Sequence, residues 1–267
     1  MADRFNCYPL MQFAGTVAAC MDFPLHEQYA PPVDWVVTLM KEKLGGPADR
    51  LVLYHADAIG NFLFSQYPEY FAPVQRHFPI SVPFVSTIES VTPVAHASMY
   101  TGMSPDGHGI KTYTRPVLTC DTLYDRLIAA GKKPCICATA GGTFHHIFNE
   151  RPMEYVKGIN GTEVLAKTLE LIEEDKYDVI SIHDCDYDDA AHAYGPESKE
   201  AKNALSLMCE RFDAMAEKIK EIYAPRGHKT LLTFSPDHGQ HATLSGKGTH
   251  GSTCMEDMNI LHFFAAL

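Results

Sequence analysis

Residues 230–239 have the sequence TLLTFSPDHG, in which a short apolar segment is followed closely by Asp-His-Gly. Thr230–Phe234 has the β-branched and aromatic content of a buried strand. Asp237 and His238 follow its end, where the parallel strands of α/β proteins present their ligand-binding side chains. The stretch therefore predicts a parallel sheet with a polar site beyond the carboxyl ends of its strands.

Strand-like and helix-like segments alternate along the rest of the chain. Further strands are predicted at residues 51–54, 83–86, 134–138, 179–182 and 259–264, and helices at residues 33–44, from 92 onward, and at 122–130, 162–174 and 199–223. This alternation is typical of an α/β fold, a mainly parallel central sheet with helices on both faces. Residues 1–32 contain four prolines and are predicted to be irregular. We expect a single domain over residues 1–267, with an N-terminal wrap and helix at 1–45 and a catalytic core at 50–267.

Composition narrows the class of protein. The 267 residues are 46% hydrophobic and 21% charged, as in ordinary globular proteins. The net charge of −11 argues against a nucleic-acid polymer or an anionic membrane as the main partner. No window reaches the roughly 18 apolar residues of a membrane span, and Met1–Phe5 lacks the features of a signal peptide. We therefore expect a cytoplasmic protein, in which the eight scattered cysteines are reduced.

Residues of the kind that bind metal ions follow three separate apolar segments. They are Asp57, Asp188, His192, Asp237 and His238, joined by His250 between two glycines. Asp188 and His192 are four residues apart, so one turn of helix brings both to the same face. Each of these motifs alone can be explained without a metal ion, as the solvated start of a helix or as a polar loop. Together, three carboxylates and three imidazoles suffice for two divalent ions with open positions.

Thr92 is the candidate nucleophile. It precedes Pro93 at the predicted start of a helix, whose first amides can hold an anion. Coordination to a metal ion would make its hydroxyl reactive at neutral pH. On local sequence alone, Thr92 is better explained as the N-cap of that helix.

Several motifs occur in an order that resembles a known family. Thr92–His96, Thr101-Gly102 and Pro105–Ile110 are similar to the nucleophile segment of the type I phosphodiesterase/nucleotide pyrophosphatase family. Asp188–Pro196 resembles the Asp-x-x-x-His-x-Tyr-Gly-Pro ligand motif of that family. Asp237–Gly239 and Thr249–Gly251 resemble the last two ligand motifs of the family. The family belongs to the alkaline phosphatase superfamily, with phosphonoacetate hydrolases as close relatives. The resemblance runs from about residue 50 to the C-terminus and implies an alkaline-phosphatase-like fold.

The resemblance also implies a ligand set and a reaction. One zinc ion would be held by Asp188, His192 and His250. The other would be held by Asp57, Asp237, His238 and the Thr92 oxygen. Manganese or iron would accept the same ligands. Thr92 would attack a small phosphate ester, a diester or a monoester that includes nucleotide-type substrates, and form a phosphoenzyme. The alternatives are a phosphonate hydrolase of the phosphonoacetate type and a homologue that binds metal without catalysis.

The chain departs from the family pattern at one position. Many members carry Asn 21 residues after the nucleophile, where it binds a phosphate oxygen, and this chain has Tyr113 there, flanked by Lys111 and Arg115. A cation reaching the site would suit a dianionic monoester or a phosphonate, whereas a neutral donor would suit a diester. Both cations are equally well explained as surface charges. Histidines outside the ligand motifs, His145, His146, His183 and His241 among them, could line a pocket. His96 and His108 more simply shape the nucleophile segment.

Overall fold

The computed structural model describes residues 5–24, 26–77 and 81–267, so residues 1–4 and 25 of the predicted N-terminal wrap lie outside the described residues. Its main sheet has the strand order β1-β3-β10-β7-β2-β6-β4-β5. The strands are β1 (Tyr8–Pro9), β2 (Arg50–Ala56), β3 (Ser81–Val85), β4 (Pro134–Thr139), β5 (Glu154–Gly158), β6 (Val179–Asp184), β7 (Thr230–Phe234) and β10 (Asn259–Ala266). Strands β7, β2, β6, β4 and β5 are parallel, and β10 is antiparallel to both of its neighbours. The predicted α/β class with a mainly parallel sheet is confirmed.

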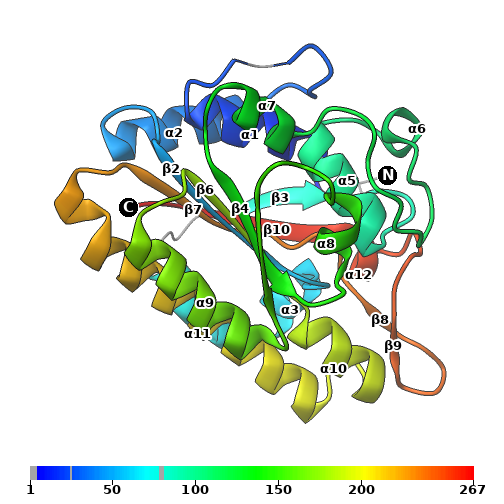
Figure 1. Cartoon of the computed structure of the whole chain (residues 1–267). Helices are drawn as coiled ribbons and strands as arrows, with labels where there is room; N and C mark the ends of the chain where they lie inside the picture. Colours follow the sequence, from blue (N-terminus) through cyan, green and yellow to red (C-terminus); the bar gives the residue numbers. More distant parts are fainter. Residues whose placement is uncertain (1–4, 25, 78–80) are drawn as a thin grey trace.

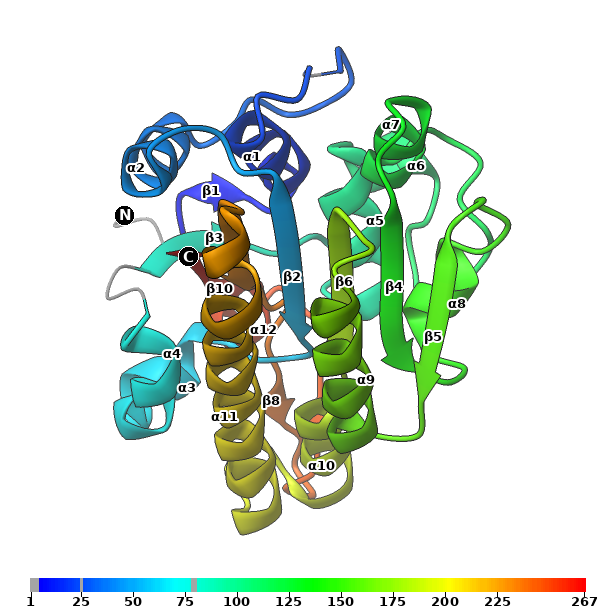
Figure 2. The ribbon, with the colours of Figure 1, turned by 60° about the vertical axis from the view of Figure 1, so that its left-hand side comes forward.

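Helices cover both faces of this sheet. They are α1 (Gln12–Cys20), α2 (Asp34–Leu44), α3 (Asn61–Gln66), α4 (Ala72–Gln75), α5 (Thr92–Thr101), α6 (Pro105–His108), α7 (Leu123–Ala129), α8 (Thr143–Ile147), α9 (Gly161–Glu174), α10 (Asp186–Tyr194), α11 (Lys199–Ile222) and α12 (Met255–Met258). The long helices α9 and α11 lie side by side on one face, and α1, α5, α7 and α8 lie on the other (Figure 1). Figure 2 shows α9 and α11 in front of the parallel strands. None of the described helices is both long and apolar enough to cross a membrane.

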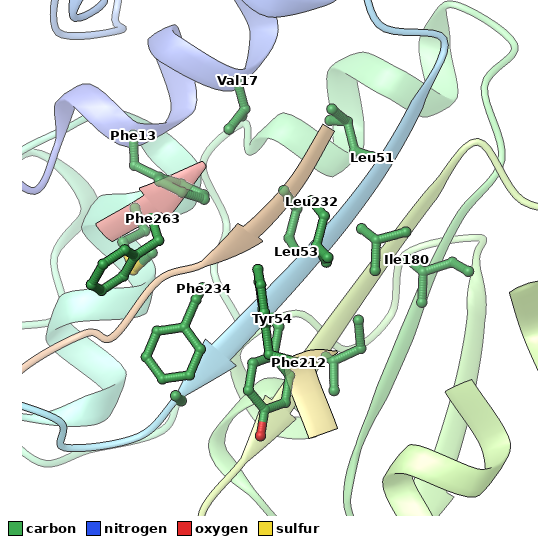
Figure 3. Close-up of a cluster of buried hydrophobic side chains, with 14 of the residues drawn as sticks. Phe13, Val17, Leu51, Leu53, Tyr54, Ile180, Phe212, Leu232, Phe234 and Phe263 are labelled. Atoms are coloured by element: carbon green, nitrogen blue, oxygen red, sulfur yellow. The ribbon is translucent and has the colours of Figure 1, made fainter. Parts of the chain in front are cut away.

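Continuous apolar runs in the central strands reflect burial on both faces. All residues of β2 from Leu51 to Ala56 are buried, as expected for a parallel strand covered by helices above and below. On the α11 face, Phe234 of β7 packs edge-to-face against Phe212 at a centroid distance of 5.8 Å (Figure 3). On the opposite face, Phe13 of α1 packs edge-to-face against His55 of β2 at 5.7 Å.

The prediction that residues 1–32 are irregular was wrong for residues 12–20. These residues form α1, whose apolar side chains, Phe13 and Val17 among them, are completely buried (Figure 3). Pro9 lies before the helix, and Pro24, Pro31 and Pro32 lie after it, so the prolines bound α1 and do not interrupt it.

A buried ion pair joins α11 to the end of β6, and its loss should be costly. The carboxylate of Asp184 is completely buried and accepts hydrogen bonds from Arg211 at 2.6 Å and from the Tyr54 hydroxyl at 2.7 Å. Arg211→Met should lower the free energy of unfolding by about 3–5 kcal/mol, because it leaves that carboxylate buried without its cation. Denaturant unfolding measures this change.

Arg226→Met provides the matched control. Arg226 is half exposed and pairs with Asp175 at 3.0 Å, an arrangement worth about 0–1 kcal/mol. Equal and small losses in the two variants would contradict the assignment of a buried, structural ion pair to Arg211.

Candidate metal centre

Three adjacent parallel strands deliver the ligand-type side chains to one edge of the sheet. Asp57 follows β2, Asp237 and His238 follow β7, and α10, which carries Asp188, begins just after β6. Strand β2 pairs with β7 on one side and with β6 on the other, so the three carboxyl ends are neighbours. This is the edge at which the sequence predicts a site, and the side chains converge there in two groups.

The first group, the Asp188 cluster, consists of Asp188, His192 and His250. His192 Nε2 lies 3.4 Å from Asp188 Oδ1 and 3.1 Å from His250 Nε2, and His250 Nε2 lies 3.8 Å from Asp188 Oδ1. Ligands bound at 2.0–2.1 Å around a tetrahedral ion are about 3.3 Å apart. The three atoms therefore have the spacing of ligands that share one ion.

The second group, the Asp57 cluster, consists of Asp57, Asp237 and His238. His238 Nε2 lies 3.6 Å from Asp57 Oδ1 and 3.4 Å from Asp237 Oδ2. The two clusters are in contact, because the rings of His238 and His250 stack at a centroid distance of 4.2 Å. The two clusters therefore adjoin through these two imidazoles.

Backbone carbonyls fix the orientation of all three imidazoles. The Nδ1 atoms of His192, His238 and His250 each lie 3.0 Å from a carbonyl oxygen, those of Gly248, Gly239 and Ser90 respectively. With Nδ1–H donating to the carbonyl, the Nε2 lone pair of each ring faces the cluster, as in metal-binding histidines. Burial lowers the pKa of His238 to about 4 and that of His250 to about 3, so both rings are neutral at pH 7.

The buried carboxylates of the clusters lack a compensating cation. Asp57 Oδ1 and Asp237 Oδ2 have no hydrogen-bond partner, and no Lys or Arg of the described residues pairs with either carboxylate. Burial, followed by the charges of Asp237 and Asp188, raises the pKa of Asp57 well above its usual value. Burial likewise raises the pKa of Asp188 to about 7. Carboxylates in this state fit divalent cations, which would supply the missing positive charge.

Thr92 lies against the Asp57 cluster and is not the N-cap of its helix. The N-cap is Val91, with extended backbone angles, and Thr92 is the first residue of α5. The Thr92 hydroxyl is turned toward the cluster, with its Oγ1 3.3 Å from His238 Nε2. The N-cap interpretation is therefore wrong by one residue, and the hydroxyl is left facing the ligand atoms.

The three substrate-binding candidates lie in different surroundings. Lys111 is exposed and pairs with Asp106 at 2.5 Å. Arg115 donates to the carbonyl of Gly141 at 2.8 Å. Tyr113 is exposed; burial of its hydroxyl raises the pKa, Arg115 lowers it, and the charges of Asp57 and Asp188 raise it further.

Further polar side chains at the centre are absent from the sequence-based ligand set. His183, at the end of β6, lies 3.0 Å from Asp57 Oδ2, and the Sγ of Cys185 lies 3.5 Å from His183 Nδ1. His96 Nε2 lies 3.4 Å from Asp237 Oδ2, so it does more than shape its own segment. Gln240 donates to Asp188 Oδ1. Their positions in the sequence could have indicated that they lie at the centre. His183 and Cys185 stand at the end of an apolar run, and Gln240 follows a ligand motif.

Similar folds occur among solved structures, although no protein-family model and no curated protein matches the sequence. The C-terminal periplasmic domain of the phosphoethanolamine transferase EptC from Campylobacter jejuni superposes with a TM-score of 0.61 at 14% identity, over 82% of this chain and 79% of that domain. An inactive variant of murine ectonucleotide pyrophosphatase/phosphodiesterase 5, in complex with AMP, gives 0.58 at 15% identity over 74% of this chain. Phosphonoacetate hydrolase from Sinorhizobium meliloti 1021, in complex with phosphonoformate, gives 0.54 at 14% identity over 75% of this chain.

The length of the chain distinguishes it from two of these structures. It spans 59% of the murine phosphodiesterase and 59% of the phosphonoacetate hydrolase. This chain shares the fold of these three proteins, and the predicted alkaline-phosphatase-like fold is confirmed.

Proposed function

We propose that this protein hydrolyses phosphate esters at a two-metal centre, with Thr92 as the nucleophile. The observation that carries the proposal is the arrangement of two three-residue clusters whose histidine Nε2 atoms converge, with the Thr92 hydroxyl 3.3 Å from one of them. Asp188, His192 and His250 would hold one divalent ion, and Asp57, Asp237 and His238 the other. Two such ions, when bound, would polarise the phosphoryl oxygens and lower the pKa of the Thr92 hydroxyl.

The residues of the chain account for the covalent steps. Thr92 Oγ1 forms a bond to phosphorus as the bond to the leaving oxygen breaks, and the proton lost by Thr92 passes by way of solvent to the leaving alcohol. Water then breaks the Oγ1–phosphorus bond and releases phosphate from a monoester or a phosphomonoester from a diester. Backbone carbonyls hold the imidazoles in place throughout, so the centre needs little rearrangement during the reaction.

Tyr113 supports a diester as the preferred substrate. Lys111 pairs with Asp106, and Arg115 donates to the carbonyl of Gly141. We therefore assign the substrate contact to the neutral Tyr113, whose hydroxyl is within range of the Asp57 and Asp188 charges. A neutral donor stabilises a singly charged diester, whereas a dianionic monoester or a phosphonate gains more from a cation. We therefore expect a higher kcat/KM for the singly charged bis-p-nitrophenyl phosphate than for the dianionic p-nitrophenyl phosphate.

Tyr113→Phe tests this preference. The variant should lower kcat/KM for the diester by roughly 10-fold, the cost of one hydrogen bond to a charged oxygen, and leave the metal content unchanged. Tyr194→Phe is the matched control, because Tyr194 is similarly exposed but lines a separate cleft. Faster turnover of the dianionic monoester than of the diester would reject the assignment of diester as the substrate class.

A further inference from the structure

A third group of metal-binding side chains lies outside the clusters described above. It consists of His241 on β8 (His241–Ala242), Cys254 just before α12, and Asp257 within α12. Strand β8 forms a small antiparallel hairpin with β9 (Gly248–Thr249), which projects from the body of the molecule (Figure 1). The proposed hydrolysis uses none of these three residues.

The geometry of the group is close to that of a zinc site. Cys254 Sγ lies 3.6 Å from His241 Nδ1. Zinc bonds of about 2.3 Å to sulfur and 2.0 Å to nitrogen place those two atoms about 3.5 Å apart in a tetrahedron. His241 Nδ1 and Asp257 Oδ1 lie 2.7 Å apart, which is a hydrogen-bond distance. An ion that replaces the shared proton would widen this separation by about 0.6 Å.

Neighbouring groups hold the carboxylate and leave a fourth position to an adjoining solvent-filled cleft. Glu256, an exposed carboxylate, lines that cleft, so its oxygen or a water molecule can complete a tetrahedron. Asp257 is completely buried, and its second oxygen, Oδ2, accepts the backbone N–H of Ser252 at 2.9 Å. Oδ1 is thereby directed at His241, as in metal sites whose carboxylate ligands are themselves hydrogen-bonded.

A cleft gives a cation access to this group. His241, Cys254 and Glu256 line a cleft of about 740 Å³ between the hairpin, α3 and the start of α11. Glu197 also lines it, and the described lining residues include no Lys or Arg. The local charge therefore attracts cations, and the combination of thiolate, imidazole and carboxylate selects zinc over the harder magnesium and calcium ions.

We propose that His241, Cys254 and Asp257 bind a structural zinc ion that clamps the segment between residues 241 and 254. That segment carries His250, and the carbonyl of Gly248 within it orients His192. His241 also pairs directly with Thr249 in the hairpin. An ion that ties the start of the segment to its end therefore fixes the two imidazoles of the Asp188 cluster from outside.

Cobalt substitution tests the site without reference to turnover. The protein, loaded with Co²⁺, should show a thiolate-to-cobalt charge-transfer band, and Cys254→Ser should abolish the band and bind one ion fewer per chain. Cys185→Ser is the matched control, because Cys185 is the other thiol near a metal-binding cluster, and the band should persist in this variant. A band lost in Cys185→Ser and retained in Cys254→Ser, or equal metal content in wild type and Cys254→Ser, would overturn the proposal.

Labelling of the unmodified protein keeps the test independent of folding in the variants. Zn²⁺ should protect Cys254 from a thiol reagent, as read by peptide mass spectrometry, while the partly buried Cys120 reacts equally with and without zinc. Reaction of Cys254 at the same rate with and without Zn²⁺ would also overturn the site. Both readouts are separate from hydrolysis, so failure of the zinc site and failure of the proposed phosphoesterase are distinguishable.

Discussion

Thr92→Ala should abolish ester hydrolysis while the protein keeps its metal ions. Removal of Oγ1 deletes the proposed nucleophile, and the loss of a nucleophile costs roughly 10⁴-fold or more in kcat. The imidazoles stay in place, because the carbonyl contacts that orient them do not involve the Thr92 side chain. Metal analysis and initial rates on bis-p-nitrophenyl phosphate measure the two effects separately.

Thr87→Ala is the matched control for this experiment. Thr87 lies in the same loop before α5, and its hydroxyl donates to the carbonyl of Glu89 at 3.1 Å. We expect its activity to stay within a few-fold of wild type. Thr92→Ser, which restores a hydroxyl at the same position, should recover part of the rate. Full activity in Thr92→Ala would rule out Thr92 as the nucleophile.

Asp237→Asn should cost the protein one metal ion and most of its activity. Asp237 Oδ2 is buried without a hydrogen-bond partner and lies 3.4 Å from the Nε2 atoms of both His238 and His96. The amide of Asn carries no charge to offset a divalent ion, so affinity at the Asp57 cluster should fall by at least roughly 100-fold. Metal content after equilibrium dialysis against limiting zinc measures the loss.

Asp121→Asn is the control for this substitution, because Asp121 is an exposed carboxylate paired with Arg126. It should retain all of its metal. Unchanged metal content in Asp237→Asn, with reduced content after substitution of Asp188, would show that Asp237 is not a ligand and would leave the Asp188 cluster standing alone.

The sequence anticipates the site where local pattern and sheet position coincide. Asp57, Asp188 and Asp237 each follow an apolar run, and parallel strands bring their carboxyl ends to one edge. The fold class was predictable for the same reason, since strand-like and helix-like segments alternate. The antiparallel direction of β10 was not predictable, because its apolar residues have the same pattern in either direction.

Other features depend on tertiary contacts that a single sequence does not specify. His183 approaches Asp57 because β2 and β6 pair in a register that places His55 beside His183. The Thr92 boundary was misplaced by one residue because Thr is a good N-cap and Val91 is a poor one. Tertiary packing against the ligand cluster overrode that local preference.

The two-metal, Thr92-dependent mechanism is tested most directly by hydrolysis of bis-p-nitrophenyl phosphate. One preparation is assayed as isolated, after chelation, and after zinc is restored. The Thr92→Ala variant is treated and assayed in the same way. We expect turnover that chelation removes and zinc restores in the wild type, with none in the variant at any stage. Turnover that survives chelation, or that Thr92→Ala retains, would contradict the proposed mechanism.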